Sequence, residues 1–360
     1  MRLGADPVTG EARRVSRTFK AKTKAAAERQ VRAYLAELDA EPTQGSSAPL
    51  SMLLEDYLRH SEALGRSPTT IYKNRQIIDR VIVPALGQIQ IADLTARHLD
   101  EFYRQLLIGP EAISASSVRR YHAIISAALN RAVKWGWLAT NVASRATLPE
   151  VERPALQVPT LEEIQQLISS LQAEKDLYGM ACLIAVSTGL RRGEVCALRW
   201  SDYAGGALTV QRSAYKVGKE VGVKSTKSGR VRLVPVIGAL ATALHQWRAR
   251  CEAAAANVEL SLSPDSYIIS DWPDGSRLLN PDTLTAAFRR AAKREGLEHV
   301  HFHSLRHFAA TELLAAGVSP RDAADVLGHA NPSLTLSVYA HSTVERQRAA
   351  MEALDRALGA

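Results

Sequence analysis

A proline-rich segment divides this chain into two parts of different character. Residues 149–160 read PEVERPALQVPT, with prolines at positions 149, 154 and 159. Proline lacks the amide hydrogen that a helix interior needs, and it disfavours the helical conformation in the residue before it. We therefore expect a linker at 149–159 between separately folded parts. The length of 360 residues agrees with this division, because it exceeds the usual size of one hydrophobic core.

The part before the linker, residues 50–148, is predicted to be a bundle of helices. Four amphipathic segments are predicted to be helical, at about 50–64, from Ser67 onward, at 95–107 and across SSVRRYHAIISAALNRAVKWGW. Ser67 followed by Pro68 is a typical helix start, and the isoleucines at 71, 78 and 82 form one apolar stripe. About a hundred residues in four such helices form a compact bundle.

A small basic α+β module is predicted at residues 1–41. ADPVTGEARR reads as a turn between strands, and a helix is predicted from about Lys24 to Leu38. Lysines and arginines cluster between the two, at Arg13, Arg14, Arg17, Lys20, Lys22 and Lys24. On composition alone this cluster fits a solvated face as well as a DNA-binding surface. Residues 42–49, PTQGSSAP, read as a linker to the bundle.

The part after the linker is predicted to be a mixed α/β domain over 160–342. Thr160 followed by Glu163 forms a capping box, which marks the start of a helix. Helical patterns continue from there, with strands predicted at 207–216 and 230–236. The fold class expected for the whole chain is therefore mainly α with small β elements.

A final helix is predicted at 343–360, where apolar residues recur on one stripe. They are Val344, Met351, Leu354 and Leu358. Such a stripe needs a surface to dock on, and the sequence leaves open whether that surface belongs to the same protomer or to a neighbour.

Composition excludes some classes of protein. The chain contains no run of eighteen apolar residues and no apolar N-terminal stretch typical of a secretory signal. Its three cysteines, Cys182, Cys196 and Cys251, form no CxxC pair, which favours a reducing compartment over a disulfide framework. We therefore expect a cytoplasmic protein. The net charge of +8 favours a nucleic-acid partner, although many basic proteins bind none.

An arginine and a glutamate stand three residues apart after a glycine that interrupts an apolar helix. In TGLRRGEVCALRW (188–200) these residues are Gly189, Arg191 and Glu194. Residues three apart share a helical face, and a buried arginine needs a carboxylate beside it. An arginine held in this way can present its fork of N–H donors to a phosphate. Alone, the pair fits a structural ion pair at a helix start equally well.

A lysine lies at a turn just before an alternating strand. This residue, Lys227, is part of TKSGRVRLVPV (226–236). Its ammonium group is a compact proton donor whose pKa falls near other cations, and a turn can carry it into a cleft. Alone the signal is weak, because most lysines at turns are simply solvated.

Histidines and an arginine are grouped in HFHSLRH (301–307). His303 and Arg306 are three apart and can face one cavity, which suits anion binding with proton transfer. A metal site at His301, His303 and His307 is the alternative, but no cysteine or carboxylate partner lies nearby at a typical spacing. We expect no metal and no other cofactor.

The last two candidates are His329 and Tyr339. Ser319, Pro320 and Gly328 begin and end a predicted helix, so His329 follows directly on a helix end. Tyr339 lies ten residues later, in TLSVYAHST. In isolation, His329 would be an ordinary loop residue and Tyr339 a packed aromatic.

The order and spacing of these segments resemble the tyrosine recombinase, or phage integrase, family. TGLRRGE, KSGRVR, HSLRH, LGHANP and the closing YAH fit the motif boxes of that family across about 160–342. SPTTIYKNR and AALNRAVKWGWLATN resemble its core-binding domain. DPVTGEARRVSRTFKAKTKAAAE is similar to an arm-binding domain, although only a few residues precede Asp6, which implies either a trimmed chain or an incomplete module.

The resemblance implies a site-specific recombinase that cuts and rejoins DNA without a metal or ATP. Tyr339 would attack the scissile phosphate and form a 3′-phosphotyrosyl bond. Arg191 and Arg306 would hold the nonbridging oxygens. The remaining implied site residues are His303 and His329 as hydrogen-bond partners of the phosphate, Lys227 as the acid for the 5′-oxygen, and Glu194 as the residue that holds Arg191.

The implied partners are double-stranded attachment sites, a homo-tetramer on DNA, and accessory DNA-bending or directionality factors. Candidates for groove contacts are Lys73, Arg75, Arg119 and Arg120, although each also fits a solvated cation. The basic N-terminal module favours integration and excision of a phage or mobile element. Chromosome-dimer resolution, a decayed DNA-binding relative and a nicking-closing topoisomerase remain alternatives.

Overall fold

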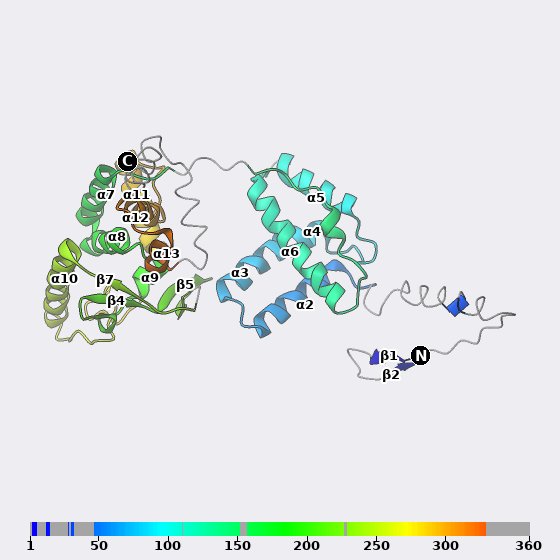
Figure 1. The fold of residues 1–360 in the computed structure, drawn as a ribbon, viewed down its shortest axis with the longest axis horizontal. Coiled ribbons are helices and arrows are strands. Elements are labelled where there is room, and N and C mark those ends of the chain that lie inside the picture. The colour runs from blue at the N-terminus through cyan, green and yellow to red at the C-terminus, as the bar shows by residue number, and fades with distance from the viewer. Residues whose placement is uncertain are drawn as a thin grey trace, which may run out of the picture. The chain divides into compact units, whose positions relative to one another are not determined.

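The computed structural model describes residues 2–5, 12–14, 28, 30–31, 47–109, 111–151, 157–226 and 229–328. The chain divides into two compact units, Met1–Arg153 and Pro154–Ala360, each of which is described by itself (Figure 1). Helices dominate both units, and the strands are few and short. The predicted fold class, mainly α with small β elements, is therefore confirmed.

The first unit contains a bundle of helices around one apolar core. Its elements are α2 (Leu50–Ala63), α3 (Pro68–Ile77), a π-helical turn η1 (Ile78–Ile82), α4 (Val83–Leu86), α5 (Ala96–Ile108), α6 (Ala115–Lys134) and a 3₁₀ turn η2 (Val142–Arg145). Buried leucines from α2, among them Leu53, Leu54 and Leu58, share one apolar core with Leu99 of α5 and Leu129 of α6. The predicted bundle is present, with its helices within a few residues of their expected positions.

Pro84 explains why the second predicted helix changes geometry along its length. It is the second residue of α4 and has no N–H to donate to the preceding turn, so the helix widens into a π turn just before it. The apolar stripe survives this change, because Ile71, Ile78 and Ile82 are all buried.

Ahead of the bundle the structure describes only a short hairpin and a few helical residues. Strand β1 (Arg2–Ala5) pairs antiparallel with β2 (Ala12–Arg14), as the turn in ADPVTGEARR predicts. Most of the helix predicted at 24–38 lies outside the described residues.

The second unit is a larger helical domain with a small β region. Its helices are α7 (Leu161–Glu174), α8 (Asp176–Thr188), α9 (Arg192–Ala197), α10 (Gly238–Ala256), α11 (Pro281–Arg294), α12 (Ser304–Ala315) and α13 (Pro320–Leu327), with a 3₁₀ turn η3 (Trp200–Asp202). The predicted capping box at the start of α7 is present. The Glu163 amide donates to the Thr160 hydroxyl at 3.2 Å, and the Thr160 amide donates to the Glu163 carboxylate at 2.8 Å.

Within the described residues of this unit, the β region consists of two separate sheets. One has the order β3-β4-β7, formed by β3 (Tyr203–Ala204), β4 (Ala207–Val210) and β7 (Arg232–Pro235). The other is the hairpin of β5 (Arg212–Val217) and β6 (Glu220–Ser225). The predicted strand segment 207–216 is extended as expected, but it forms two strands in different sheets. The chain leaves the first sheet at Gln211, whose side chain donates to Asp202 at 3.0 Å, and β5 pairs with β6.

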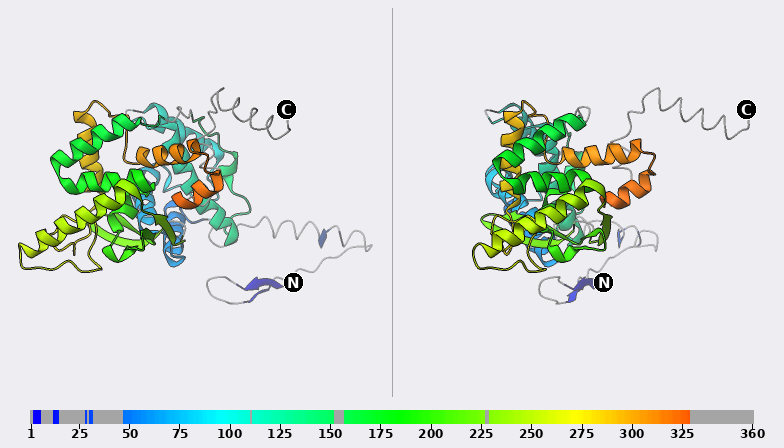
Figure 2. Two further views of the ribbon diagram at one scale, coloured as in Figure 1. Left: turned by 60° about the vertical axis from the view of Figure 1, so that its left-hand side comes forward. Right: turned by 90° about the vertical axis from the view of Figure 1, so that its left-hand side faces the viewer.

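Helix α8 lies at the centre of this unit and directs the chain toward the site. Most of its residues are buried, including Gly179, Ala181, Cys182 and Ile184, and it packs against both α7 and α12. Helices α12 and α13, drawn in orange, lie together in both views of Figure 2, joined by Ala309, Ala310 and Leu327. The end of α8 and the end of α13 thereby meet.

Candidate active site

Gly189 makes the turn that places Arg191. Helix α8 ends there with a left-handed φ of 65°, which glycine adopts at little cost. A Cβ at this position would lie 2.2 Å from Cδ2 of Leu327, so packing as well as backbone conformation requires glycine. The chain then reverses into α9, with Arg191 directly before its first residue.

Arg191 and Glu194 form the predicted pair. The Arg191 amide donates to Oε2 of Glu194 at 2.9 Å, and Nη1 donates to Oε1 at 3.0 Å. Glu194 is buried, whereas 29% of the Arg191 side chain is exposed. Nη2 of Arg191 donates to the carbonyl of Gly328 at 3.0 Å. The carboxylate thus fixes one edge of a guanidinium that remains accessible from outside.

Arg306 is a buried cation that forms no ion pair with any described residue. It is 2% exposed, and Nη1 donates to the carbonyls of Leu327 at 2.6 Å and Gly189 at 2.8 Å. Nη2 is buried with no hydrogen-bond partner in the described part of the chain. Burial, and then the charge of Arg191, lower the pKa of Arg306 to about 9. The group still stays protonated at neutral pH, and a bound anion would stabilise it.

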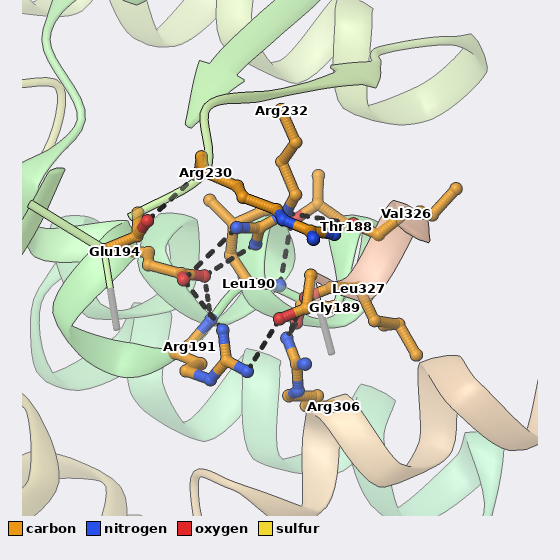
Figure 3. A network of polar contacts seen from close by, with 12 residues as sticks. Thr188, Gly189, Leu190, Arg191, Glu194, Arg230, Arg232, Arg306, Val326 and Leu327 are labelled. Atoms are coloured by element: carbon orange, nitrogen blue, oxygen red, sulfur yellow. Dashed lines mark hydrogen bonds and ion pairs between the residues drawn. The ribbon is translucent and has the colours of Figure 1, made fainter. Parts of the chain in front are cut away.

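Arg232 joins this network although sequence reasoning did not select it. From β7 its Nη2 donates to Oε2 of Glu194 at 2.7 Å, Nη1 to Oε1 at 3.3 Å, and Nε to the carbonyl of Val326 at 3.1 Å. Figure 3 shows Arg191, Arg232 and Arg306 gathered around the end of α13. The sequence points to Arg232 only through the presence of a cation in the strand that follows Lys227.

His303 stands directly before α12, three residues from Arg306 as predicted. Its ring meets the ring of His307 edge to face, with 4.8 Å between centroids. Although His303 is an exposed residue, partial loss of hydration lowers its pKa to about 4, helped by the charges of His307, Arg306 and Arg191. At neutral pH the imidazole is therefore uncharged and able to accept a proton.

Lys227, His329 and Tyr339 lie outside the described residues. The structure describes residues next to Lys227 and His329. Thr226 accepts a backbone hydrogen bond from Gly229 at 2.9 Å, and Gly328 ends α13 with a φ of 69°. The helix predicted between Ser319 and Gly328 is present, with the Ser319 hydroxyl accepting from the amide of Asp322 at 3.1 Å.

Among the described side chains, the three cysteines and His301 form no hydrogen bond or ion pair with this network. Burial raises the pKa values of Cys182 and Cys196 to about 12, so both remain thiols. His301 is exposed, and the described residues contain no group of three or more His, Cys, Asp or Glu side chains placed to hold a metal ion.

The four cations proposed for DNA contact in the bundle have different surroundings. Arg75 pairs with Glu55 at 2.8 Å, and Nε of Arg119 donates to the carbonyl of Pro149 at 2.7 Å. Lys73 is exposed. Arg120 lines a pocket formed by residues of α2, α3 and α6 and the turn between α2 and α3; the other lining residues are Tyr57, Ser61, Arg66, Thr70, Ile71, Asn74, Ala123 and Ile124.

No helix within the described ranges has the length and apolar character needed to cross a membrane.

Known proteins share both the sequence pattern and the fold. The family model described as phage integrase matches residues 157–346, and that of the N-terminal SAM-like domain of phage integrases matches residues 50–107. A XerC-like tyrosine recombinase of Caldanaerobacter subterraneus is 25% identical, over 95% of this chain and 92% of its own. The ICEBs1 integrase of Bacillus subtilis is 24% identical, over 98% of this chain and 95% of its own.

Solved structures agree in fold. The Tn1549 transposon integrase in complex with transposon right end DNA aligns with a TM-score of 0.70 at 20% identity, covering 85% of this chain and 99% of that one. A lambda integrase tetramer bound to a Holliday junction aligns with a TM-score of 0.62 at 21% identity, covering 91% of this chain and 92% of that one. Because the family model matches more than half of its residues, the chain belongs to the phage integrase family and is a tyrosine-type site-specific DNA recombinase.

Proposed function

We propose that this recombinase integrates and excises a mobile genetic element, with Arg191 and Arg306 binding the scissile phosphate. The observation that carries the assignment of the site is the buried Arg306, whose Nη2 has no partner among the described residues. Arg191 lies close enough for its charge to lower the pKa of Arg306. Two guanidinium groups in this arrangement suit the two nonbridging oxygens of a phosphodiester.

In the proposed reaction the phenol oxygen of Tyr339 attacks the scissile phosphorus. A 3′-phosphotyrosyl bond forms, the bond to the 5′-oxygen breaks, and Lys227 gives that oxygen its proton. His303, uncharged at neutral pH, accepts the phenol proton, and His329 donates a hydrogen bond to the phosphate. The reverse reaction, with a new 5′-hydroxyl as nucleophile, rejoins the strand, because the phosphotyrosyl bond keeps the energy of the phosphodiester.

The charges of the described side chains support this chemistry. A free tyrosine has a pKa of about 10 and is a poor nucleophile at neutral pH. Arg191, Arg232 and Arg306 carry three positive charges against the single negative charge of Glu194. The surplus favours both the phenolate and the additional charge that builds on the phosphate oxygens in the transition state.

The basic N-terminal module favours an element integrase over a chromosome-dimer-resolution enzyme. The extent of the sequence matches does not separate the two, because the ICEBs1 integrase matches 98% of this chain, the XerC-like recombinase of Caldanaerobacter subterraneus 95% and the XerC of Xylella fastidiosa strain M23 81%. The basic module at 1–41 is the natural candidate for distal arm sites. Deleting 1–47 should abolish recombination that depends on arm sites and spare core-site binding; unchanged recombination would count against the integrase role.

We also propose the partners and the domain roles. Residues 50–148 would bind core DNA, 160–342 would carry catalysis, and the helix at 343–360 would contact a neighbouring protomer in a tetramer on DNA. Accessory DNA-bending or directionality factors belong to the same proposal. Within the bundle, Lys73 and Arg120 are now the stronger candidates for DNA contact, because Glu55 and the Pro149 carbonyl already engage Arg75 and Arg119.

Capture of the covalent intermediate tests the nucleophile. On a nicked suicide substrate, which lets the cleaved strand end diffuse away, the wild type should form an SDS-resistant protein–DNA adduct. Tyr339→Phe should form no adduct. Tyr203→Phe, the control, removes the hydroxyl of a tyrosine in β3 and should form as much adduct as the wild type. A Tyr339→Phe protein that still forms the adduct would refute the assignment. A wild type without adduct would indicate a decayed relative, and supercoil relaxation without recombinants would indicate a topoisomerase.

Loss of either phosphate-binding arginine should separate cleavage from binding. Arg191→Ala and Arg306→Ala should each slow cleavage by about 100-fold or more, the effect expected when a transition-state hydrogen-bond donor is removed. Affinity for the core site should change little, because many other cations contact DNA. Normal cleavage with a large loss of affinity would place these residues away from the scissile phosphate.

A further inference from the structure

We propose that Arg232 is a positioning residue for strand cleavage, which acts by sharing Glu194 with Arg191 and by fixing the end of α13. This inference rests on the proposed function of Arg191 and Arg306.

The side chain of Arg232 is fully committed to protein contacts. Only 10% of it is exposed, and Nε, Nη1 and Nη2 all donate to protein oxygens: the Val326 carbonyl and the two oxygens of the Glu194 carboxylate. Arg306 differs, because its Nη2 has no partner in the described ranges. Arg232 is therefore suited to hold other groups in place, and Arg306 to bind an anion.

The last turn of α13 is held by three arginines from three different elements. The carbonyls of Val326, Leu327 and Gly328 accept hydrogen bonds at 3.1, 2.6 and 3.0 Å from Arg232 of β7, Arg306 of α12 and Arg191 at the start of α9 (Figure 3). Helix ends leave such carbonyls without partners inside the helix. The arginines that face the proposed phosphate are thus bonded to the helix end that leads into His329.

Gly328 shows how closely Arg232 approaches this helix end. A Cβ at position 328 would lie 2.8 Å from Nη1 and 2.9 Å from Cζ of Arg232. The guanidinium therefore occupies the space beside the backbone, and any larger residue would displace it. Arg232 also lies five residues after Lys227 along the chain. One side chain thus ties the strand that follows Lys227 to the helix that precedes His329.

Arg232 also controls how much negative charge Arg191 experiences. Burial of the Glu194 carboxyl would raise its pKa, but hydrogen bonding and charge from Arg232, and then from Arg191, lower it. Without Arg232, the whole carboxylate charge would act on Arg191 alone. That guanidinium would then be held more tightly by Glu194 and would attract the phosphate less strongly.

The test is the rate of adduct formation on the suicide substrate, measured in a single turnover with saturating protein. Arg232→Gln should cleave about 10- to 100-fold more slowly than the wild type, as expected when a group that orients site residues is lost. Core-site affinity should stay within about 3-fold, because Arg232 does not contact DNA in this scheme. Arg232→Lys should fall between the two, since an ammonium keeps the charge but not the fork of donors.

The matched control is Arg212→Gln. Arg212 donates to both oxygens of Asp202, at 2.7 and 2.6 Å, in the same unit, and Asp202 is buried like Glu194. Arg212→Gln breaks an ion pair of the same kind. Arg212 has no described bond to α13 or to Glu194, so cleavage by this variant should remain near the wild-type rate. An equal loss in Arg212→Gln and Arg232→Gln would show a general effect of broken ion pairs and overturn the inference.

A double-mutant cycle with Glu194→Gln separates positioning from simple stability. If Arg232 acts through Glu194, adding Arg232→Gln to Glu194→Gln should slow cleavage by less than about 3-fold further, because the two changes are coupled. Fully multiplicative losses would overturn the route through Glu194, because the bond from Arg232 to the Val326 carbonyl would then account for the whole effect. If Arg232→Gln fails to fold by circular dichroism, Arg232→Lys decides, and a folded Arg232→Lys protein with the wild-type rate would overturn it.

A wild type that forms no adduct refutes the proposed function itself. A wild type that forms the adduct, together with an Arg232→Gln protein of equal rate, refutes only the role of Arg232.

Discussion

The partners of two buried charged residues explain why the candidate site carries a surplus of positive charge inside the protein. Glu194 and Arg306 are 1% and 2% exposed. A buried charge is costly unless it is paired. Glu194 is paired with both Arg191 and Arg232, whereas Arg306 has carbonyl acceptors in place of a carboxylate. The residue left with unsatisfied charge is the one proposed to meet the DNA phosphate.

His303 should make stability depend on pH below neutrality. Its pKa is about 4 in the folded protein and about 6.5 in an unfolded chain. Between these values the unfolded chain binds more protons, so this contribution to stability is complete above pH 6.5 and is lost as the pH falls toward 4. In His303→Gln the loss of stability between pH 7 and pH 5 should be about 1 kcal/mol smaller than in the wild type. This figure is below the one that the full pKa difference gives, because His303 is exposed and solvent screens its charge.

The measurement is urea unfolding of wild type and His303→Gln at pH 7 and pH 5. The wild type should lose more stability than the variant between the two values. Parallel losses would show that His303 is as well hydrated in the folded protein as in the unfolded chain.

At the scale of elements, helix ends rather than helix faces build the site. Arg191 follows the end of α8, His303 precedes α12, and Gly328 ends α13. Left-handed glycines at the ends of α8 and α13 let the chain turn sharply there. The exposed carbonyls of the last turn of α13 then serve as acceptors for arginines from other elements.

Two glycines in similar backbone conformations give a sharp comparison. Gly317 and Gly328 have φ values of 83° and 69°, but only Gly328 has atoms within 4 Å of a Cβ position. Gly317→Ala should lower the free energy of unfolding by about 1–2 kcal/mol through backbone strain and leave cleavage unchanged. Gly328→Ala should lower it further and slow adduct formation, because the methyl group displaces Arg232.

Thermal or urea unfolding together with the suicide-substrate assay would check both variants. Equal effects of the two substitutions on stability and on cleavage would mean that the space beside Gly328 has no functional importance.

For the whole molecule, the positive net charge predicts that DNA affinity depends strongly on salt. The net charge is +8, and neutralised phosphates release counterions on binding, so the logarithm of affinity should fall linearly with the logarithm of salt concentration. Arg120→Gln should reduce the slope by about 1 if Arg120 contacts a phosphate. Arg75→Gln should change the slope less, because Glu55 balances its charge.

Fluorescence anisotropy with a core-site duplex at a series of salt concentrations measures these slopes. An Arg120→Gln slope equal to that of the wild type, with a reduced slope for Arg75→Gln, would reverse the assignment of the two side chains.

The sequence by itself determined the features that depend on neighbouring residues. The capping box at Thr160, the glycine stop at Gly189, the helix between Ser319 and Gly328, and the Arg191–Glu194 pair all involve residues within about one helical turn. Such interactions follow from backbone geometry, and local spacing reveals them. The fold class and the family also followed from sequence, since the order of the motifs is preserved along the chain.

Only the tertiary structure decided which distant groups meet. Arg232 is 38 residues from Glu194, and Arg191 is 137 residues from the Gly328 carbonyl that it bonds. The same holds for the pairing of Arg75 with Glu55 and for the exchange of strand partners at Gln211. These contacts depend on how whole helices and strands pack. Burial of apolar faces brings the elements together, and the buried polar groups then form hydrogen bonds with the groups that packing places beside them.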